Sequence, residues 1–158
     1  MFGELLTAFL IVAVCTVIHV GVIVVFAQFL WLRFSTLETV TTLMQQAFVL
    51  VLVFAVVIGL SLIEAGIWAT FYYFRDLFSN FETALYFSLG TYSTIGYGDV
   101  VLPQRWRLLG GIEGISGVLL CALSGAFVFA VLNVLFQSRI QSLSSRAGSS
   151  LSKLTGLR

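Results

Sequence analysis

Long apolar segments dominate the chain, and three of them are long enough to cross a lipid bilayer. They cover residues 3–32, 46–74 and 108–136, and polar residues gather in the stretches between them. Because about 20 consecutive apolar residues span the hydrocarbon core, each segment predicts a transmembrane helix. The first segment is too long for the core of a signal peptide and has no basic start, so we expect it to be retained.

A fourth helical segment, residues 81–92, is too short to cross the bilayer. Ser79 or Asn80 can cap its start, and Glu82 in its first turn suits the helix dipole. These signals predict a helix that enters the membrane and ends inside it, where protein or water must satisfy its last carbonyls. A short amphipathic segment at residues 34–44 is expected to lie along the membrane interface.

The composition supports a membrane protein. The chain is 59% hydrophobic and 9% charged, whereas about a quarter of the residues in a soluble domain are charged. Trp68, Tyr72 and Tyr73 crowd the end of the second long segment, which predicts an aromatic belt at the water interface. The formal net charge of +1 gives no indication of a nucleic-acid partner.

Catalytic chemistry is not indicated. The sequence has no zinc-ligand spacing, no phosphate-binding loop and no pairing of a nucleophile with a base, so we expect neither enzyme activity nor a cofactor. Cys15 and Cys121 both fall inside apolar segments. They are expected to be buried thiols rather than a disulfide, a metal site or a redox pair.

The six residues T-I-G-Y-G-D, which begin at Thr94, carry the clearest chemical signal. Stacked rings of backbone carbonyls from Thr94 to Tyr97 can replace the water shell of a potassium ion, and the Thr94 hydroxyl adds a further ring. Carbonyls that all point one way need left-handed backbone at alternate residues, which Gly96 and Gly98 adopt at little cost. Tyr97 would then point away from the central axis of these rings, and Asp99 would lie at the outer mouth of the pore that they surround.

This stretch resembles the selectivity-filter signature of potassium channels, and the chain is identified as a member of that family over roughly residues 60–135. Residues 86–88 before the motif and 106–108 after it are similar to the pattern of bacterial two-helix potassium channels. The resemblance implies an all-α membrane protein. Its three transmembrane helices would be joined by a re-entrant pore helix and a selectivity-filter loop.

The resemblance also implies roles for individual residues. The filter would be formed by Thr94, Ile95, Gly96, Tyr97 and Gly98, with K⁺ as the permeant ion bound at Thr94, Ile95, Gly96 and Tyr97. Asp99 would brace the filter from behind together with Tyr86, while Gly90 stands where some channels carry a glutamate. Gly117 falls near the hinge glycine of the pore-lining helix, and it serves either as that hinge or as a packing contact with the pore helix.

The same resemblance divides the chain into four parts. These are an extra N-terminal transmembrane helix at the periphery (1–33), a cytoplasmic interfacial linker (34–45), a pore domain (46–137) and a basic, serine-rich cytoplasmic tail (138–158). The tail is expected to be a frayed helix end followed by disorder, or to touch anionic lipid. Because a ring of carbonyls needs four contributors, we expect a homotetramer. The N-terminus would lie outside the cell and the C-terminus in the cytoplasm, with the inner membrane of a prokaryote as the expected location.

Ionisable residues deep inside the apolar segments are candidates for structural or sensing roles. From the helical rise, Glu64 and Glu113 fall at similar depth beside the pore helix. We expect at least one of them to be protonated at neutral pH, since burial and a neighbouring like charge disfavour the charged form. They could hold the pore helix through Ser88 or Thr91 and make the filter sensitive to pH, or they could form two separate structural hydrogen bonds. His19 is expected to be a neutral hydrogen-bonding residue.

The sequence therefore predicts a potassium-selective channel that conducts dehydrated K⁺ passively. No segment carries the regularly spaced arginines of a voltage sensor, and the sequence does not identify the stimulus that opens the channel. The alternatives are a non-conducting or transporter-associated subunit that keeps the pore fold, and a non-selective cation channel. The intact G-Y-G argues against a transporter subunit, and Tyr97 at the centre of the motif favours potassium selectivity.

Overall fold

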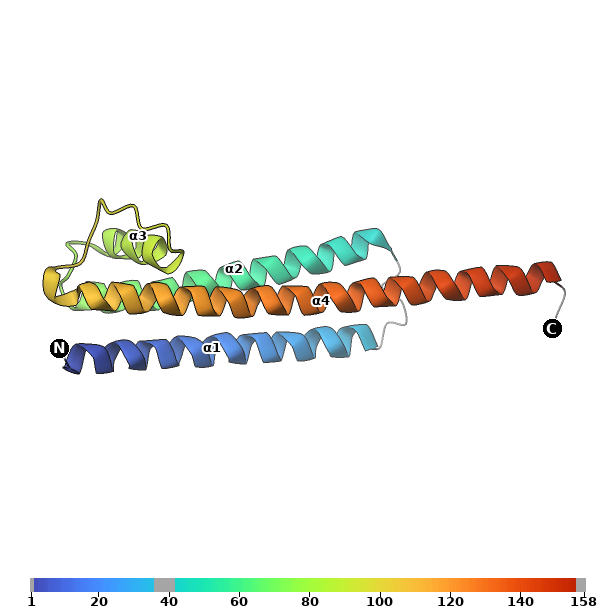
Figure 1. Cartoon of the computed structure of the whole chain (residues 1–158), viewed down its shortest axis with the longest axis horizontal. Coiled ribbons are helices and arrows are strands. Elements are labelled where there is room, and N and C mark those ends of the chain that lie inside the picture. The colour runs from blue at the N-terminus through green and yellow to red at the C-terminus, as the bar shows by residue number, and fades with distance from the viewer. Residues whose placement is uncertain (1, 36–41, 156–158) are drawn as a thin grey trace.

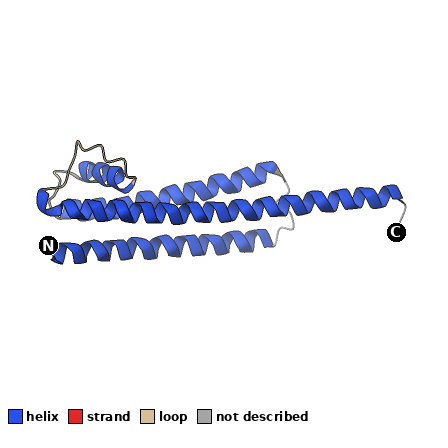
Figure 2. Cartoon of the chain, viewed as in Figure 1, coloured by secondary structure: helices blue, strands red, loops and turns tan. Residues whose placement is uncertain are grey.

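The computed structural model describes residues 2–35 and 42–155, and within these ranges it contains helices and no strands (Figures 1 and 2). Three long helices lie side by side, and a short helix packs near one end of them (Figure 1). The elements are α1 (Phe2–Ser35), α2 (Leu43–Phe74), α3 (Phe81–Tyr92), the 3-10 turn η1 (Gln104–Trp106) and α4 (Arg107–Thr155). The predicted all-α fold of three long helices and one short helix is confirmed.

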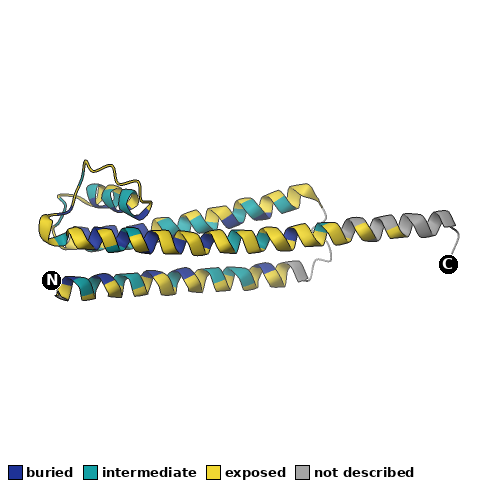
Figure 3. Cartoon of the chain, viewed as in Figure 1, coloured by how far each residue is buried: buried dark blue, intermediate teal, exposed yellow. Residues whose placement is uncertain are grey.

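Each long helix contains a segment apolar enough to cross a membrane. These segments run over Gly3–Arg33, Leu43–Phe74 and Gln104–Gln141, close to the predicted spans. Figure 3 shows exposed positions along all three helices, and large apolar side chains such as Phe9 and Val17 are among them. Apolar surface of this extent is unfavourable in water. The arrangement is that of a multi-pass membrane protein.

The short helix α3 begins where the sequence predicts. Asn80 Oδ1 accepts a hydrogen bond from the Thr83 amide at 2.8 Å, and Glu82 lies in the first turn. The helix ends at Tyr92, and the amide of the next residue, Ser93, still donates to a carbonyl of the last turn. Because α3 contacts both α2 and α4, it is held beside two long helices.

The main core lies where α3 meets the ends of α2 and α4. Trp68 and Tyr72 of α2 are fully buried there, and the Tyr72 ring lies 6.2 Å from the Phe78 ring and 5.5 Å from the Phe87 ring, measured between centroids. The predicted aromatic belt is therefore wrong for Trp68 and Tyr72, because both are buried inside the protein, with Phe78 of the connection and Phe87 of α3 packed against Tyr72. Tyr73, which is 41% exposed, is the one member of the predicted belt that stays accessible.

The structure differs from the prediction at the C-terminal end. α4 continues to Thr155 instead of fraying after Gln137. Serine lowers helix propensity only slightly, and the one proline of the chain, Pro103, precedes α4. Nothing in the tail sequence therefore forces the helix to stop where the apolar span ends.

Two further predictions, for the interfacial segment and for the cysteines, are confirmed only in part or fall partly outside the described residues. The predicted interfacial segment at residues 34–44 includes residues 36–41, which lie outside the described residues, and its remaining positions fall in or beside the ends of α1 and α2. Cys15 is buried, as predicted, but Cys121 is exposed. The prediction for Cys121 is wrong because its side chain lies on a face of α4 that the other described elements leave uncovered.

Candidate functional site

The loop that follows α3 has an alternating backbone. Thr94, Gly96 and Gly98 have φ angles of 60°, 53° and 78°, whereas Ile95 and Tyr97 between them do not have positive φ. The predicted left-handed conformation at alternate residues is confirmed, and it includes Thr94, a residue type that rarely adopts it. This alternation turns successive peptide units alike, so that neighbouring carbonyl oxygens can face one side of the loop.

Hydrogen bonds to α3 hold the start of this loop. The Thr94 amide donates to the Thr91 carbonyl at 3.0 Å, and the Gly96 amide donates to the Gly90 carbonyl at 3.0 Å. Gly90 has no side chain that could brace the loop, but its carbonyl does so. Both acceptors lie in the last turn of α3, where the carbonyls of a helix lack partners within the helix itself. Carbonyls at the end of α3 and amides at the start of the loop therefore satisfy one another's hydrogen-bonding capacity.

Tyr86 and Asp99 form the hydrogen bond that the sequence predicts. The Tyr86 hydroxyl donates to Asp99 Oδ2 at 2.8 Å, and Asp99 Oδ1 accepts from the Val100 amide at 3.0 Å. The rings of Tyr86 and Tyr97 stack with their centroids 6.2 Å apart and their planes 10° from parallel. The bond to Asp99 raises the pKa of the Tyr86 phenol, so Tyr86 keeps the donated proton at neutral pH. The far end of the loop is thereby tied back to α3.

Glu113 of α4 is fully buried against α2 and α3. The Tyr72 hydroxyl donates to Glu113 Oε2 at 2.7 Å, and Ser88 Oγ forms a hydrogen bond with Glu113 Oε1. The Ser88 hydroxyl also lies 2.7 Å from the Ala65 carbonyl oxygen. A hydroxyl has one proton and a carbonyl can only accept, so with Ser88 donating to Ala65, Glu113 supplies the proton between itself and Ser88. This arrangement predicts that Glu113 is protonated.

Glu64 of α2 is also fully buried, but both of its partners can donate. The Tyr92 hydroxyl donates to Glu64 Oε2, and His19 Nδ1 lies 2.8 Å from Glu64 Oε1. His19 Nε2 in turn lies 3.1 Å from Ser124 Oγ. A tautomer with Nδ1–H directed at Glu64 leaves Nε2 to accept from the Ser124 hydroxyl, so each ring nitrogen has a partner. His19 is placed as a hydrogen-bonding residue between α2 and α4.

The predicted carboxyl pair therefore holds α3 at two positions, Ser88 and Tyr92, which lie about one turn apart. Ser88 was among the predicted contacts, and Tyr92 was not. Within the described residues no hydrogen bond joins Glu64 to Glu113, and each carboxyl has its own partners. The contact between Glu113 and Ser88 is one that the sequence predicted, and the separate partners fit the alternative of two structural hydrogen bonds. Sensitivity of the filter to pH stays a prediction.

We expect Glu113→Gln to be tolerated and Glu64→Gln to destabilise the protein. At position 113 the amide can donate to Ser88 and accept from Tyr72, as a protonated carboxyl does. At position 64 the amide has a single oxygen for Tyr92 and His19 together, so one of these partners must turn from donor to acceptor or stay unpaired. A buried polar group left unpaired costs about 1–3 kcal/mol. Thermal unfolding of both variants beside the wild type measures the difference. A larger loss for Glu113→Gln than for Glu64→Gln would contradict the proton assignment.

Glycines of α4 allow α3 to approach closely. A Cβ built at Gly110 would lie 3.3 Å from the Phe87 ring, and one at Gly117 would lie 2.2 Å from the Tyr92 carbonyl oxygen. Gly110 therefore lies in close contact with Phe87 of α3. Gly117 is a packing contact with α3, which is one of its two predicted roles, while the hinge role stays a prediction.

The sequence did not reveal the roles of four residues. Three of them, Tyr72, Tyr92 and Ser124, form the buried hydrogen bonds, and the fourth, Arg105, pairs with Glu4. The paired positions lie between 28 and 105 residues apart along the chain. The available signal was a polar side chain within or beside an apolar segment. Such a residue indicates a buried hydrogen bond without indicating its partner.

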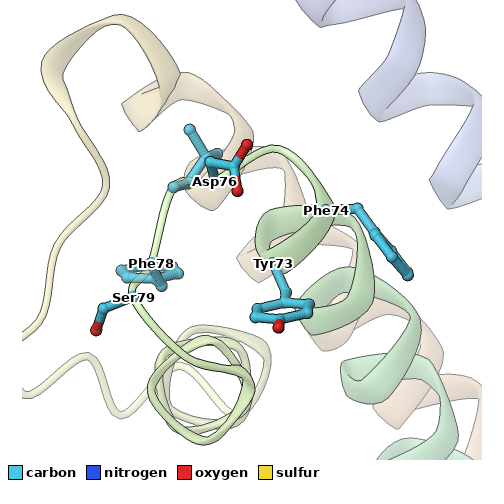
Figure 4. A pocket seen from close by; sticks show the side chains of 6 residues that line it. Tyr73, Phe74, Asp76, Phe78 and Ser79 are labelled. Carbon is cyan, nitrogen blue, oxygen red and sulfur yellow. The ribbon is translucent and has the colours of Figure 1, made fainter.

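An open pocket of about 520 Å³ lies at the connection between α2 and α3. Figure 4 shows Tyr73 and Phe74 at the end of α2, with Asp76, Phe78 and Ser79 on the connection. The lining offers one carboxylate among aromatic and small side chains, and it includes no residue of the loop after α3. The pocket is therefore separate from the candidate site.

The oxygen atoms of the loop are the candidates for binding a cation. Across residues 2–35 and 42–155, the structure contains no group of three His, Cys, Asp or Glu side chains that could hold a metal ion. The Thr94–Tyr97 carbonyls and the Thr94 hydroxyl are neutral oxygens, which can replace the water around a monovalent cation.

Comparison with known proteins identifies the region that contains this loop. A family model described as "Ion channel" matches residues 46–134, more than half of the chain. Two-pore potassium channel 4 of Arabidopsis thaliana is 41% identical over 69 residues, which are 40% of this chain and 24% of the plant protein, so the match spans about a quarter of that relative. No solved structure matches. The chain belongs to the ion channel family and carries a pore region of the potassium channel type.

Proposed function

We propose that the chain is a subunit of a potassium-selective channel in which residues 94–98 form the selectivity filter. The observation that carries this proposal is the left-handed backbone at Thr94, Gly96 and Gly98, directly after α3 and inside the region that matches the family. Residues 46–137 are the proposed pore domain. Since one chain supplies one loop, four copies around a common axis would complete the filter.

The proposed filter binds K⁺ through neutral oxygen atoms. In four copies, the carbonyls of Thr94, Ile95, Gly96 and Tyr97 would form stacked rings, and the Thr94 hydroxyls would add another. Each ring replaces part of the water shell, and neighbouring ions displace one another from ring to ring, so K⁺ moves passively down its gradient. The C-terminal end of α3 leads into this loop, and the negative end of its helix dipole favours a cation there.

Contacts with α3 support a loop of fixed shape. They are the Tyr86–Asp99, Ser88–Glu113 and Tyr92–Glu64 hydrogen bonds. The first binds the loop itself, and the other two hold the helix from which the loop starts. A loop with so few contacts of its own depends on these bonds to keep its carbonyls in position.

We propose that the loop faces the outside of the cell. Glu4 in the first turn of α1 pairs with Arg105 of η1, which brings the start of α1 to the end of the molecule that carries the loop (Figure 1). α4 ends on the opposite side, and its Arg139, Arg146 and Lys153 suit the cytoplasmic side of a membrane. The proposed location is the cell membrane, which is the inner membrane if the organism is a prokaryote.

Reversal potentials of the purified chain in planar bilayers test the proposed function. With K⁺ on one side and Na⁺ on the other, we expect a current that reverses close to the potassium equilibrium potential. Chemical cross-linking of the same preparation should give four copies. These outcomes follow from a filter that needs four loops and replaces the water shell of K⁺ better than that of Na⁺.

Other outcomes of this experiment would favour the alternative functions. A reversal potential near zero would identify a non-selective cation channel. Verified tetramers that carry no current across a range of voltage, pH and membrane tension would favour a non-conducting or transporter-associated subunit with the pore fold.

A further inference from the structure

One histidine connects three helices. His19 lies near the middle of α1 and is fully buried. Its Nδ1 lies 2.8 Å from Glu64 Oε1 on α2, and its Nε2 lies 3.1 Å from Ser124 Oγ on α4. Through its two ring nitrogens, a single side chain of α1 therefore contacts both neighbouring long helices.

Glu64 extends this connection to α3. Its second carboxyl oxygen accepts a hydrogen bond from the Tyr92 hydroxyl. Tyr92 is the last residue of α3, and Thr94, with its φ of 60°, follows two residues later. The Tyr92 carbonyl faces Gly117 of α4 at close range. Both the ring and the backbone of the residue that leads into the loop are thereby held.

The chemistry of His19 suits this position. A neutral imidazole donates through one nitrogen and accepts through the other, which matches a carboxylate on one side and a hydroxyl on the other. A polar side chain in a membrane-spanning helix is unfavourable unless it makes such bonds. α1 also lies outside residues 46–134, which match the ion channel family, so the family resemblance assigns His19 no role.

We propose that His19 is a positioning residue for the selectivity filter. It holds Glu64 toward Tyr92, Tyr92 fixes the end of α3, and the end of α3 sets the start of the loop at Thr94. Ser124 connects the same imidazole to α4, so a shift of α4 is transmitted to the loop. The inference rests on the proposed function of the loop, and it makes α1 part of the support of the filter rather than a peripheral helix.

Reversal potentials of His19 variants test this role. His19→Leu removes both hydrogen bonds, and we expect the K⁺/Na⁺ permeability ratio to fall about two- to thirtyfold, the range of coupling effects between separated sites. His19→Gln keeps a donor and an acceptor and should recover part of the ratio. The matched control is Thr16→Val. Thr16 is an exposed residue of α1 whose hydroxyl donates to Val12 of the same helix, so this variant should keep the wild-type ratio.

A second variant covers the case in which His19→Leu does not assemble. Ser124→Ala removes only the partner on α4, and a smaller fall in the same direction is expected. A wild-type permeability ratio in an assembled His19→Leu channel would overturn the inference. If that variant does not assemble, a wild-type ratio in Ser124→Ala would overturn it.

A spectroscopic measurement separates positioning from simple packing. The chain contains one histidine, so ¹⁵N-histidine labelling of the full chain in lipid bilayers reports on His19 alone. We expect its ring-nitrogen signals to differ between K⁺ and Na⁺ solutions, and Tyr92→Phe to reduce that difference. A selective wild-type channel whose His19 signals are the same in both ions would overturn this inference alone. A wild-type chain without selective current would overturn the proposed function, and this inference with it.

Discussion

Replacing Gly96 with alanine is expected to abolish potassium-selective current. Gly96 has a φ of 53°, and a residue with a side chain in this region costs roughly 1–2 kcal/mol in each copy. Turning the peptide unit relieves that strain and removes a carbonyl from the row that faces the ion. No atom lies within 4 Å of a Cβ built at Gly96, so the expected effect comes from the backbone alone. Reversal potentials with K⁺ and Na⁺ on opposite sides measure it.

Gly59→Ala is the matched control for this prediction. Gly59 lies within α2, and a Cβ built there also meets nothing within 4 Å. Because its backbone is helical, alanine is favoured at this position, and we expect the current to be unchanged. Potassium selectivity that survives Gly96→Ala would mean that the loop after α3 is not the ion path.

Replacing Gly117 with alanine is expected to destabilise the packing of α3 on α4. The new Cβ would lie 2.2 Å from the Tyr92 carbonyl oxygen and 3.0 Å from its carbonyl carbon. These are backbone atoms, so relief requires a shift of a whole helix, and overpacking of this kind costs about 1–3 kcal/mol. A lower midpoint of thermal unfolding is the expected result. Since Tyr92 lies two residues before Thr94, we also expect a lower K⁺/Na⁺ permeability ratio.

Gly125→Ala on the same helix is the control for Gly117→Ala. A Cβ built at Gly125 meets nothing within 4 Å. Both substitutions add one methyl group and raise the helix propensity of α4 equally, so they differ only in the space around the new Cβ. Equal unfolding midpoints for the two variants would contradict the close contact between α4 and the end of α3.

Gly96 and Gly117 are expected to affect the channel in different ways. Gly96→Ala changes a loop outside the packed helices, so we expect the thermal unfolding of the helices to change little. Gly117→Ala acts on the helix packing first and on the loop through Tyr92. We expect both variants to lose potassium selectivity and only Gly117→Ala to unfold at a lower temperature.

The long helices could be predicted from the sequence because their signals are local. An apolar segment of about 30 residues fits the bilayer wherever it lies in the chain, and the spans found in the structure agree closely with the predicted ones. The start of α3 follows from one capping residue, Asn80. The left-handed backbone at Gly96 and Gly98 follows equally from the conformational freedom of glycine.

The environment of individual side chains could be predicted only in part. Helical rise places Glu64 and Glu113 at similar depth, and both are buried beside α3. The same reasoning placed Trp68 and Tyr72 at the water interface, whereas the fold buries them. Depth along a helix follows from counting residues, but the face that a neighbouring helix covers depends on how the helices pack.

The sequence by itself determined that this protein has three helices apolar enough to span a membrane, a short fourth helix and a glycine-containing loop of the potassium channel type. Only the tertiary structure decided which groups hold that loop in place. Three of these groups, His19, Tyr92 and Ser124, lie far apart along the chain. They come together around Glu64 because the four helices that carry them pack against one another. Residue spacing within a helix carries no information about which residue of another helix lies opposite, so these contacts depend on the packed fold.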